Sequence, residues 1–348
     1  MQEHDVVGIG NAIVDIIGRC DDDFLARFDA PKGHMRLVEE PTIRELYDAM
    51  GPAIEISGGS VANSMAGLSG LGGKAAFIGK VAKDTFGEIF AHDIRAAGVS
   101  FETAAADGGT PTARSLILVT PDGERTMNTF LGVSPEVDSG EIDAAMIGDA
   151  AITYLEGYLF DRDEAKHAFG EAARIARATG RKVSLTLSDG FCVDRHRDSF
   201  LSLIKNDIDI LFANEDEICS LYQTSSFDEA ARNVAADAEL AVLTRSEKGS
   251  LVINGDAKHQ ADAFPVDEVV DTTGAGDLFA AGFLYGYSNN FEHTRSARLG
   301  SLAAAEIISH IGARPETDLR KLAQDHGRGA PNFMFADVVE RYLHRTTM

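Results

Sequence analysis

The sequence predicts an α/β protein in which a largely parallel sheet is covered by helices on both faces. The main observation is that, from about residue 150 onward, short apolar runs alternate with helical patterns, as in parallel strands joined by crossover helices. Polar residues directly follow several of these runs, at the edge of the sheet where ligands bind in such folds. The strands are expected at residues 151–155, 182–187, 208–212, 241–244 and 250–253, and the helices at about 163–178, 196–205, 215–222 and 227–236.

The earlier part of the chain predicts a second, smaller sheet beside the main one. Two of its strand-like runs are joined by Pro121-Asp122-Gly123, a tripeptide that favours a hairpin turn. Another run carries a single aspartate, Asp15, among β-branched residues, which is unusual in a half-buried strand. The runs lie at residues 6–10, 11–17, 35–38, 115–120 and 125–131. We expect the first run to join the main sheet and the other four to form a sheet of their own.

Composition and charge exclude several classes of function. The chain has 348 residues, of which 44% are hydrophobic and 25% charged, as is typical of a globular protein. Its 55 acidic and 32 basic residues give a net charge of −23, which argues against binding to nucleic acid or to an anionic membrane. The three cysteines have no metal or disulfide spacing, and no apolar run is long enough for a signal peptide or a membrane span. The sequence therefore predicts a cytoplasmic protein.

A glycine-rich turn, Asp271-Thr272-Thr273-Gly274-Ala275-Gly276-Asp277, is the most informative stretch of the chain. The apolar run before it, residues 266–270, is expected to be a strand, and the apolar segment after it, residues 278–284, a helix. The first N–H groups of such a helix and its dipole bind anions. Asp277 would lie beside this anion site, where a carboxylate can take a proton from a hydroxyl while N–H groups stabilise a transferring phosphoryl. The simpler alternative is that Asp277 only complements the helix N-terminus.

A second glycine-rich block begins at Gly58-Gly59-Ser60-Val61-Ala62-Asn63 and extends through Gly87. Together, the two blocks resemble the two signatures of the ribokinase-like (PfkB) carbohydrate and nucleoside kinase family, and the resemblance runs from Gly8 to about Pro315. It implies an ATP-dependent kinase with a three-layer α/β sandwich, a mostly parallel central sheet and a small β-sheet lid. The expected domain is a single one over residues 1–348, with its lid formed by parts of about 12–20, 34–57 and 100–132.

The resemblance also implies roles for individual residues. Asp277 would be the catalytic base, and the backbone of Gly274, Ala275 and Gly276 the anion hole for the γ-phosphate of ATP. On the substrate side, the expected residues are Asp15, Gly58, Gly59, Asn63, Ile13, Leu37 and Phe130. Among these, Asp15 would hold sugar hydroxyls, and the three apolar residues would lie under the lid. Ordinary packing of the lid or core is the alternative for each of the three.

The nucleotide and metal sites are expected on the other side of the turn. Asn214-x-x-Glu217 resembles the family's motif that organises Mg²⁺ through its water shell, although the same spacing is a generic helix-capping pattern. The residues expected to contact ATP are Asn214, Thr244, Gly249, Thr273, Gly274 and Gly276. In some relatives a monovalent cation such as K⁺ is held at the positions of Asp271 and Thr273.

The substrate is predicted to be a small molecule, most specifically adenosine, which would be converted to AMP. The pattern Gly58-Gly59-Ser60-x-x-Asn63-Ser64 and the long separation between Asp15 and Gly58 look more like adenosine kinases than like ribokinases. Sugar kinase activity of the ribokinase or fructokinase type is the first alternative. A catalytically idle nucleoside- or sugar-binding sensor is a more remote one. For the assembly, both a monomer and a homodimer are consistent with the sequence.

Overall fold

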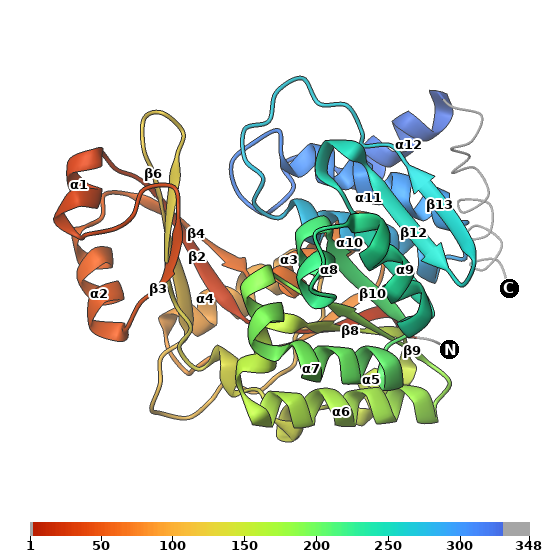
Figure 1. Cartoon of the computed structure of the whole chain (residues 1–348). Coiled ribbons are helices and arrows are strands. Elements are labelled where there is room, and N and C mark those ends of the chain that lie inside the picture. The colour runs from red at the N-terminus through yellow and green to blue at the C-terminus, as the bar shows by residue number, and fades with distance from the viewer. Residues whose placement is uncertain (1–2, 330–348) are drawn as a thin grey trace, which may run out of the picture.

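The computed structural model describes residues 3–329, which form two separate sheets (Figure 1). The large sheet has eight strands, and neighbouring strands from β5 to β11 run parallel, whereas β12 and β13 are antiparallel at one edge. In spatial order the strands are β13 (Ala257–Ala261), β12 (Ser250–Asn254), β11 (Leu240–Thr244), β10 (Ile210–Asn214), β9 (Lys182–Thr186), β8 (Ala150–Glu156), β1 (His4–Ile9) and β5 (Ala75–Ile78). The predicted α/β class with a mostly parallel sheet is confirmed.

Helices cover both faces of the large sheet. Successive strand residues point to opposite sides, and both sets are apolar, so each face needs a covering layer. Tyr154 belongs to the apolar cluster on one face, whereas Leu155 belongs to the cluster on the other. The first face is covered by α3 (Ser60–Gly70), α10 (Ala275–Ser288), α11 (His293–Ile307) and α12 (Leu319–Gly329). The second is covered by α5 (Ala144–Asp149), α6 (Asp163–Ala178), α7 (Gly190–Asp207), α8 (Glu215–Leu221) and α9 (Phe227–Asp237). The result is a three-layer arrangement.

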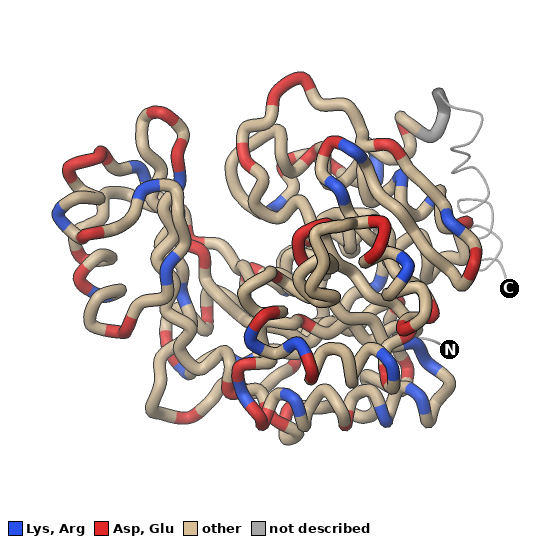
Figure 2. Tube along the Cα trace, viewed as in Figure 1, with Lys and Arg blue, Asp and Glu red and all other residues tan. Residues whose placement is uncertain are grey.

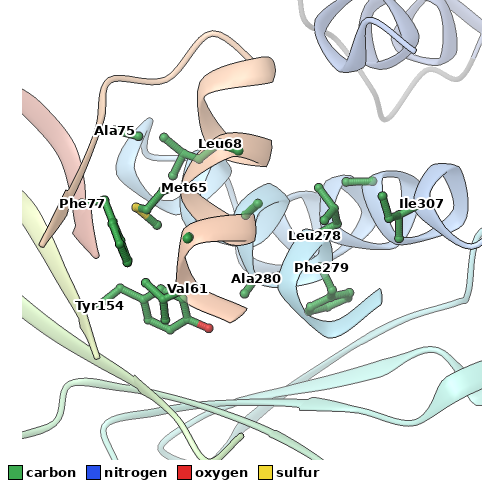
Figure 3. Packing of buried hydrophobic residues seen from close by; sticks show 14 of the residues in the cluster. Val61, Met65, Leu68, Ala75, Phe77, Tyr154, Leu278, Phe279, Ala280 and Ile307 are labelled. Atoms are coloured by element: carbon green, nitrogen blue, oxygen red, sulfur yellow. The ribbon is translucent and has the colours of Figure 1, made fainter. Parts of the chain in front are cut away.

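Helices α3 and α10 pack directly against each other above the sheet. Figure 3 shows Val61 and Met65 of α3 between the sheet residues Phe77 and Tyr154 and the helix α10. The two helices approach closely because Gly67 faces α10, where an added Cβ would lie 2.4 Å from Leu278 Cδ1. This packing brings the N-terminal ends of the two helices into contact.

The small sheet has five strands, in the order β3 (Met35–Leu37), β7 (Arg125–Phe130), β6 (Ala113–Val119), β2 (Ile13–Arg19) and β4 (Ala53–Gly58). Its strand register places one row of residues side by side: Leu37, Thr129, Ser115, Asp15 and Ile56. The opposite face carries Val14, Ile16, Leu116 and Leu118, all buried. Three helices, α1 (Asp22–Arg27), α2 (Glu40–Ala49) and α4 (Thr85–Ala96), accompany this sheet, and Figure 1 shows α1 and α2 on its side away from the large sheet.

Some elements differ from the sequence-based expectations. Residues 266–270 form no strand, and Val269 and Val270 are 54% and 45% exposed, so this short apolar run is not part of a core. Helix α7 starts at Gly190 rather than near 196, because two helical segments join across a kink at His196. No element was expected at β4, β5, β13, α5 or α12. Within residues 3–329, every helix is too short or too polar to cross a membrane.

Candidate active site

The N-terminus of α3 is built on two glycines that no other residue could replace without displacing a neighbour. Gly59 has φ 102°, and a Cβ on it would lie 2.1 Å from the carbonyl oxygen of Asn11. A Cβ on Gly58 would lie 2.3 Å from Asp15 Oδ2. These glycines therefore let β4 pass close to β2, so that Asp15 lies beside the start of α3.

The N-terminus of α10 is also led by a glycine, but the space above it is open. Gly274 has φ 81° in the left-handed region, and no side chain of the described residues caps the helix. Gly276 is exposed, and an added Cβ there would meet nothing within 4 Å. The N–H of Gly276 is therefore accessible to an anion, which the helix dipole would attract, whereas that of Ala275 donates to the carbonyl oxygen of Thr272 at 3.2 Å.

Asp277 lies where these two helix N-termini meet. Its Oδ1 accepts a hydrogen bond from Ser60 Oγ at 2.6 Å, and its Oδ2 accepts one from Asn63 Nδ2 at 3.0 Å. Burial raises the pKa of Asp277 to about 6, although Ser60, Asn63 and the charge of Arg314 each favour the ionised form. The carboxylate is thus ionised at neutral pH and more basic than an ordinary aspartate, as a general base for a hydroxyl requires.

Asp15 points from the small sheet toward the same place. Its carboxylate accepts no hydrogen bond from the described residues, yet burial raises its pKa to about 7, with Arg314 lowering the pKa and Asp277 raising it. The buried Oδ1 of Asn63 also has no hydrogen-bond partner among these residues. Two unpaired acceptors beside Asp277 are suited to hydroxyl groups of a bound molecule.

The structure separates the three apolar residues that were expected together. Ile13 lies two residues from Asp15 on the same strand face, and Leu37 lies in the same row of the sheet. Phe130 lies on the opposite face, because it pairs with Arg114, whose guanidinium stacks over both Phe130 and Phe86 of α4. The expectation that Phe130 lines the substrate pocket is therefore not met, since Phe130 packs under the helices.

Asn214 and Glu217 form the capping box that their spacing predicts. Asn214 Oδ1 accepts from Glu217 N at 2.8 Å, while Glu217 accepts from the backbone and side chain of Asn214. Burial raises the pKa of Glu217 to about 7, and the nearby charges of Asp189, Asp216 and Asp277 add to this effect. A buried carboxylate with other acidic side chains nearby fits a divalent cation that is held through water and substrate phosphates. Within residues 3–329, no group of three His, Cys, Asp or Glu residues could hold a metal alone.

The other residues expected near the nucleotide follow neighbouring strands. Thr244 ends β11 directly beside Asn214 at the end of β10. Gly249 has φ 79° and follows a short 3-10 turn, where a Cβ would lie 2.1 Å from the carbonyl oxygen of Ala261. The backbone conformation and the close carbonyl oxygen therefore require a glycine at position 249. Thr244 lies at the carboxyl ends of the parallel strands, where ligands bind in such sheets.

Asp271 is fully engaged within the protein. Its Oδ1 accepts from the N–H of Thr273 at 3.0 Å, and its Oδ2 accepts from the N–H of Gly312 at 3.1 Å. Oδ2 also forms an ion pair with Arg125 of the small sheet. A monovalent cation at Asp271 and Thr273 would have to compete with this arginine, so the residues present do not fit the expected cation.

Two charged residues near the site, the buried Glu156 and the partly buried Arg314, were not singled out from the sequence. Glu156, at the end of β8, accepts from Asn11 Nδ2 at 2.6 Å and from the N–H of Val61 at 2.9 Å. Arg314 follows α11 and donates to the carbonyl oxygens of Ser57 and Ala62. Glu156 could have been found as a polar residue at a strand end, whereas nothing local in the sequence distinguishes Arg314.

Acidic residues are spread over both parts of the molecule and outnumber the basic ones (Figure 2). A bound phosphate therefore depends on local groups, such as the first turn of α10.

Asp277 combines a raised pKa with a position next to an open helix N-terminus, an arrangement that suits transfer of a phosphoryl group to a hydroxyl. A family model described as "pfkB family carbohydrate kinase" matches residues 55–319, and the chain belongs to this family.

Individual relatives agree with this assignment. The chain is 31% identical over 270 residues to "Probable fructokinase-6, chloroplastic" of Arabidopsis thaliana, which covers 74% of this chain and 69% of that protein. Two solved structures share 50% sequence identity and a TM-score of 0.87 with it. One is a probable sugar kinase from Rhizobium etli CFN 42, covering 94% of this chain and 99% of the other. The second is an adenosine kinase from Sinorhizobium meliloti, covering 93% and 99%. The protein is an ATP-dependent phosphotransferase of the sugar and nucleoside kinase type.

Proposed function

We propose that the protein is an adenosine kinase, which transfers the γ-phosphoryl group of ATP to the primary 5′-hydroxyl of adenosine and forms AMP. The observation that carries this proposal is the environment of Asp15. Its unpaired carboxylate lies among apolar side chains on the open face of the small sheet, including Ile13, Ile56 and Leu37. A ligand that fits this surface has vicinal hydroxyls next to a flat apolar group.

The exposure of these apolar side chains favours a nucleoside over a bare sugar. Leu37 is 59% exposed, and Met35 and Ile54 of the same sheet are 48% and 68% exposed. Exposed apolar groups gathered in one place commonly mark a binding surface. A purine would cover such side chains while its ribose hydroxyls reach Asp15 and Asn63, whereas a free sugar would leave them in water.

The proposed chemistry uses the chain's own groups in fixed roles. Asp277 takes the proton of the 5′-hydroxyl as that oxygen attacks the γ-phosphorus, the bond from phosphorus to the β,γ-bridging oxygen breaks and ADP leaves. Ser60 and Asn63 hold the carboxylate of Asp277 in place. The N–H groups of Gly274, Ala275 and Gly276 stabilise the transferring phosphoryl. Thr273, Thr244 and Gly249 border the nucleotide, and the small sheet closes over the acceptor as a lid that excludes water. Bound with ATP near Asn214 and Glu217, Mg²⁺ would offset the phosphate charge.

A sugar kinase is the second candidate. It is favoured by the relatives named as fructokinase and probable sugar kinase, one of which is as similar to this chain as the adenosine kinase is. A hexose or pentose could place its hydroxyls on Asp15 and Asn63 in the same way. The two candidates share the catalytic groups and differ only in what covers the apolar face of the lid.

The test is a coupled ADP-release assay with Mg-ATP and four acceptors: adenosine, ribose, fructose and 2-keto-3-deoxygluconate. We expect turnover with adenosine at a micromolar KM and a strongly reduced kcat with Asp277→Asn, the matched control. Leu37→Asn should raise the KM for adenosine without a comparable change in kcat, because Leu37 contacts only the base. Turnover with a sugar alone would assign the sugar kinase. Binding of an acceptor without any turnover would instead favour an idle sensor.

A further inference from the structure

Arg125 and Asp271 connect the small sheet to the glycine-rich turn. Arg125 is the first residue of β7 and lies on the same face as Asp15, because Arg125, Met127 and Thr129 alternate along the strand. Asp271 is the first residue of the turn that leads into α10. The two side chains are only 10% and 5% exposed, so their ion pair is buried between the two parts of the molecule.

Asp271 organises the backbone on both sides of the anion-binding turn. Its Oδ1 accepts a hydrogen bond from the N–H of Thr273, which precedes Gly274. Its Oδ2 accepts one from the N–H of Gly312, which follows α11. A buried carboxylate in this position needs a positive partner. Among the basic side chains of residues 3–329, Arg125 alone forms an ion pair with Asp271. The turn that stabilises the phosphoryl group is therefore tied to a charge on the small sheet.

One donor of this arginine is left unused. Nη2 of Arg125 is buried and has no hydrogen-bond partner among the described residues. An unpaired buried donor is destabilising, so an ion pair with a purely structural role would be expected to have an acceptor for this nitrogen as well. The free donor indicates that an oxygen of a bound molecule, such as a nucleotide phosphate, completes the arrangement.

We propose that Arg125 is a positioning residue that supplies, from the small sheet, the positive charge that a bound monovalent cation would otherwise supply at Asp271. Two consequences follow. Phosphoryl transfer does not require K⁺, and the anion-binding turn is correctly shaped only while the small sheet holds Arg125 against Asp271. The proposal rests on phosphoryl transfer at Asp277 and not on the identity of the acceptor, so any accepted nucleoside or sugar serves for the test.

The first experiment compares turnover in KCl with turnover in tetramethylammonium chloride at equal ionic strength. For the unaltered protein we expect rates within about twofold of each other, because Arg125 already supplies the positive charge next to Asp271. Arg125→Met should lose at least about tenfold in kcat in tetramethylammonium, since 1.4 kcal/mol of lost positioning corresponds to tenfold. Added K⁺ or guanidinium should restore part of this loss. Strong activation of the unaltered protein by K⁺ would overturn the proposal.

Arg19 offers a matched control. It lies on the same face and in the same row of the small sheet, because both Arg19 and Arg125 pair with Val119, but it is exposed. Arg19→Met should change neither kcat nor the response to K⁺. If Arg125→Met turned over in tetramethylammonium as fast as the unaltered protein does, that result would contradict the proposal. So would a folded, slow Arg125→Met variant that neither K⁺ nor guanidinium improves, since the pair would then be only structural.

A second variant and a readout without turnover keep the test independent of folding and of the acceptor. Arg125→Lys retains the charge but lacks a second donor nitrogen at the place of Nη2, so it should remain independent of K⁺ with a raised KM for ATP. Thermal unfolding should show that K⁺, relative to tetramethylammonium, raises the Tm of Arg125→Met and leaves that of the unaltered protein unchanged. Equal responses of the two Tm values would refute the replacement of a cation by Arg125, even if no acceptor were phosphorylated.

Discussion

Helices α3 and α10 begin in the same way but are used differently. Each follows a glycine with positive φ, Gly59 or Gly274, and the two helices pack against each other. Their N-termini meet at Asp277, which belongs to α10 and accepts hydrogen bonds from α3. Both termini therefore carry the partial positive charge of a helix dipole at the same small volume.

The difference is in what neutralises each terminus. At α3, the carboxylate of Glu156 accepts the N–H of Val61, and this glutamate is 1% exposed. At α10, no described side chain takes that place, and Gly276 is exposed. One anion site is thus filled permanently by the protein, and the other is left for a phosphate of the substrate. The same glycine pattern gives a rigid support in one case and a reactive site in the other.

The largest expected effect is at the residue where the two helices meet. Asp277→Asn should lower kcat by about 10²- to 10⁴-fold, the usual contribution of a general base. The amide keeps the shape and at least one of the hydrogen bonds to Ser60 and Asn63, so the Tm should change little. The measurement is steady-state kinetics of ADP release together with thermal unfolding. Retention of most of the kcat would mean that Asp277 only complements its helix.

Glu156→Ala tests whether the α3 terminus is purely structural. The substitution leaves the side-chain amide of Asn11 and the N–H of Val61 without their acceptor, at about 1–3 kcal/mol per buried donor. We expect the free energy of unfolding in urea to fall by about 2–6 kcal/mol. Glu156→Gln, which keeps one acceptor oxygen, should cost less. A stable but inactive Glu156→Ala would instead make this glutamate a substrate ligand and remove the distinction between the two termini.

The sequence was sufficient to predict those features whose geometry is determined by a few consecutive residues. The turn at 271–277 and the Gly58-Gly59 block could be recognised because a helix N-terminus is defined by a few consecutive residues. Phe130 was misplaced because the two faces of a strand alternate with each residue, and the register of the hairpin decides which residue faces the substrate. Its neighbour Thr129 is the residue that lies in the same row as Asp15.

Contacts between distant segments could not be predicted in this way. Arg125 and Asp271 are separated by 146 positions, and Arg314 reaches Ser57 across 257. Their pairing depends on how the small sheet and the segment after α11 are placed in space. The apolar run 266–270 was also ambiguous, since a short apolar run has no periodicity that separates a strand from a loop.

Gly276→Ala sharpens the contrast between the open and the filled terminus. The new methyl group would meet nothing within 4 Å, so the folded protein should be as stable as before or slightly more so. With ATP bound, the methyl group would stand where the phosphoryl group approaches the helix, and kcat/KM for ATP should fall by about 10- to 100-fold. Gly59→Ala is the comparison, because its Cβ would lie 2.1 Å from a carbonyl oxygen. That variant should mainly lose stability.

The smallest effect concerns the pH dependence, in which the two termini act together. Because the pKa of Asp277 is raised to about 6, kcat/KM should fall as the pH drops through about 6, where the base becomes protonated. The charge of Arg314 lowers the pKa of Asp277, so Arg314→Met should move the acid limb of the profile to higher pH. Arg314→Lys retains the positive charge and should leave the limb near its original position, even if the hydrogen bonds to Ser57 weaken. Equal profiles for the two variants would show that Arg314 acts only by holding the backbone that leads into α3.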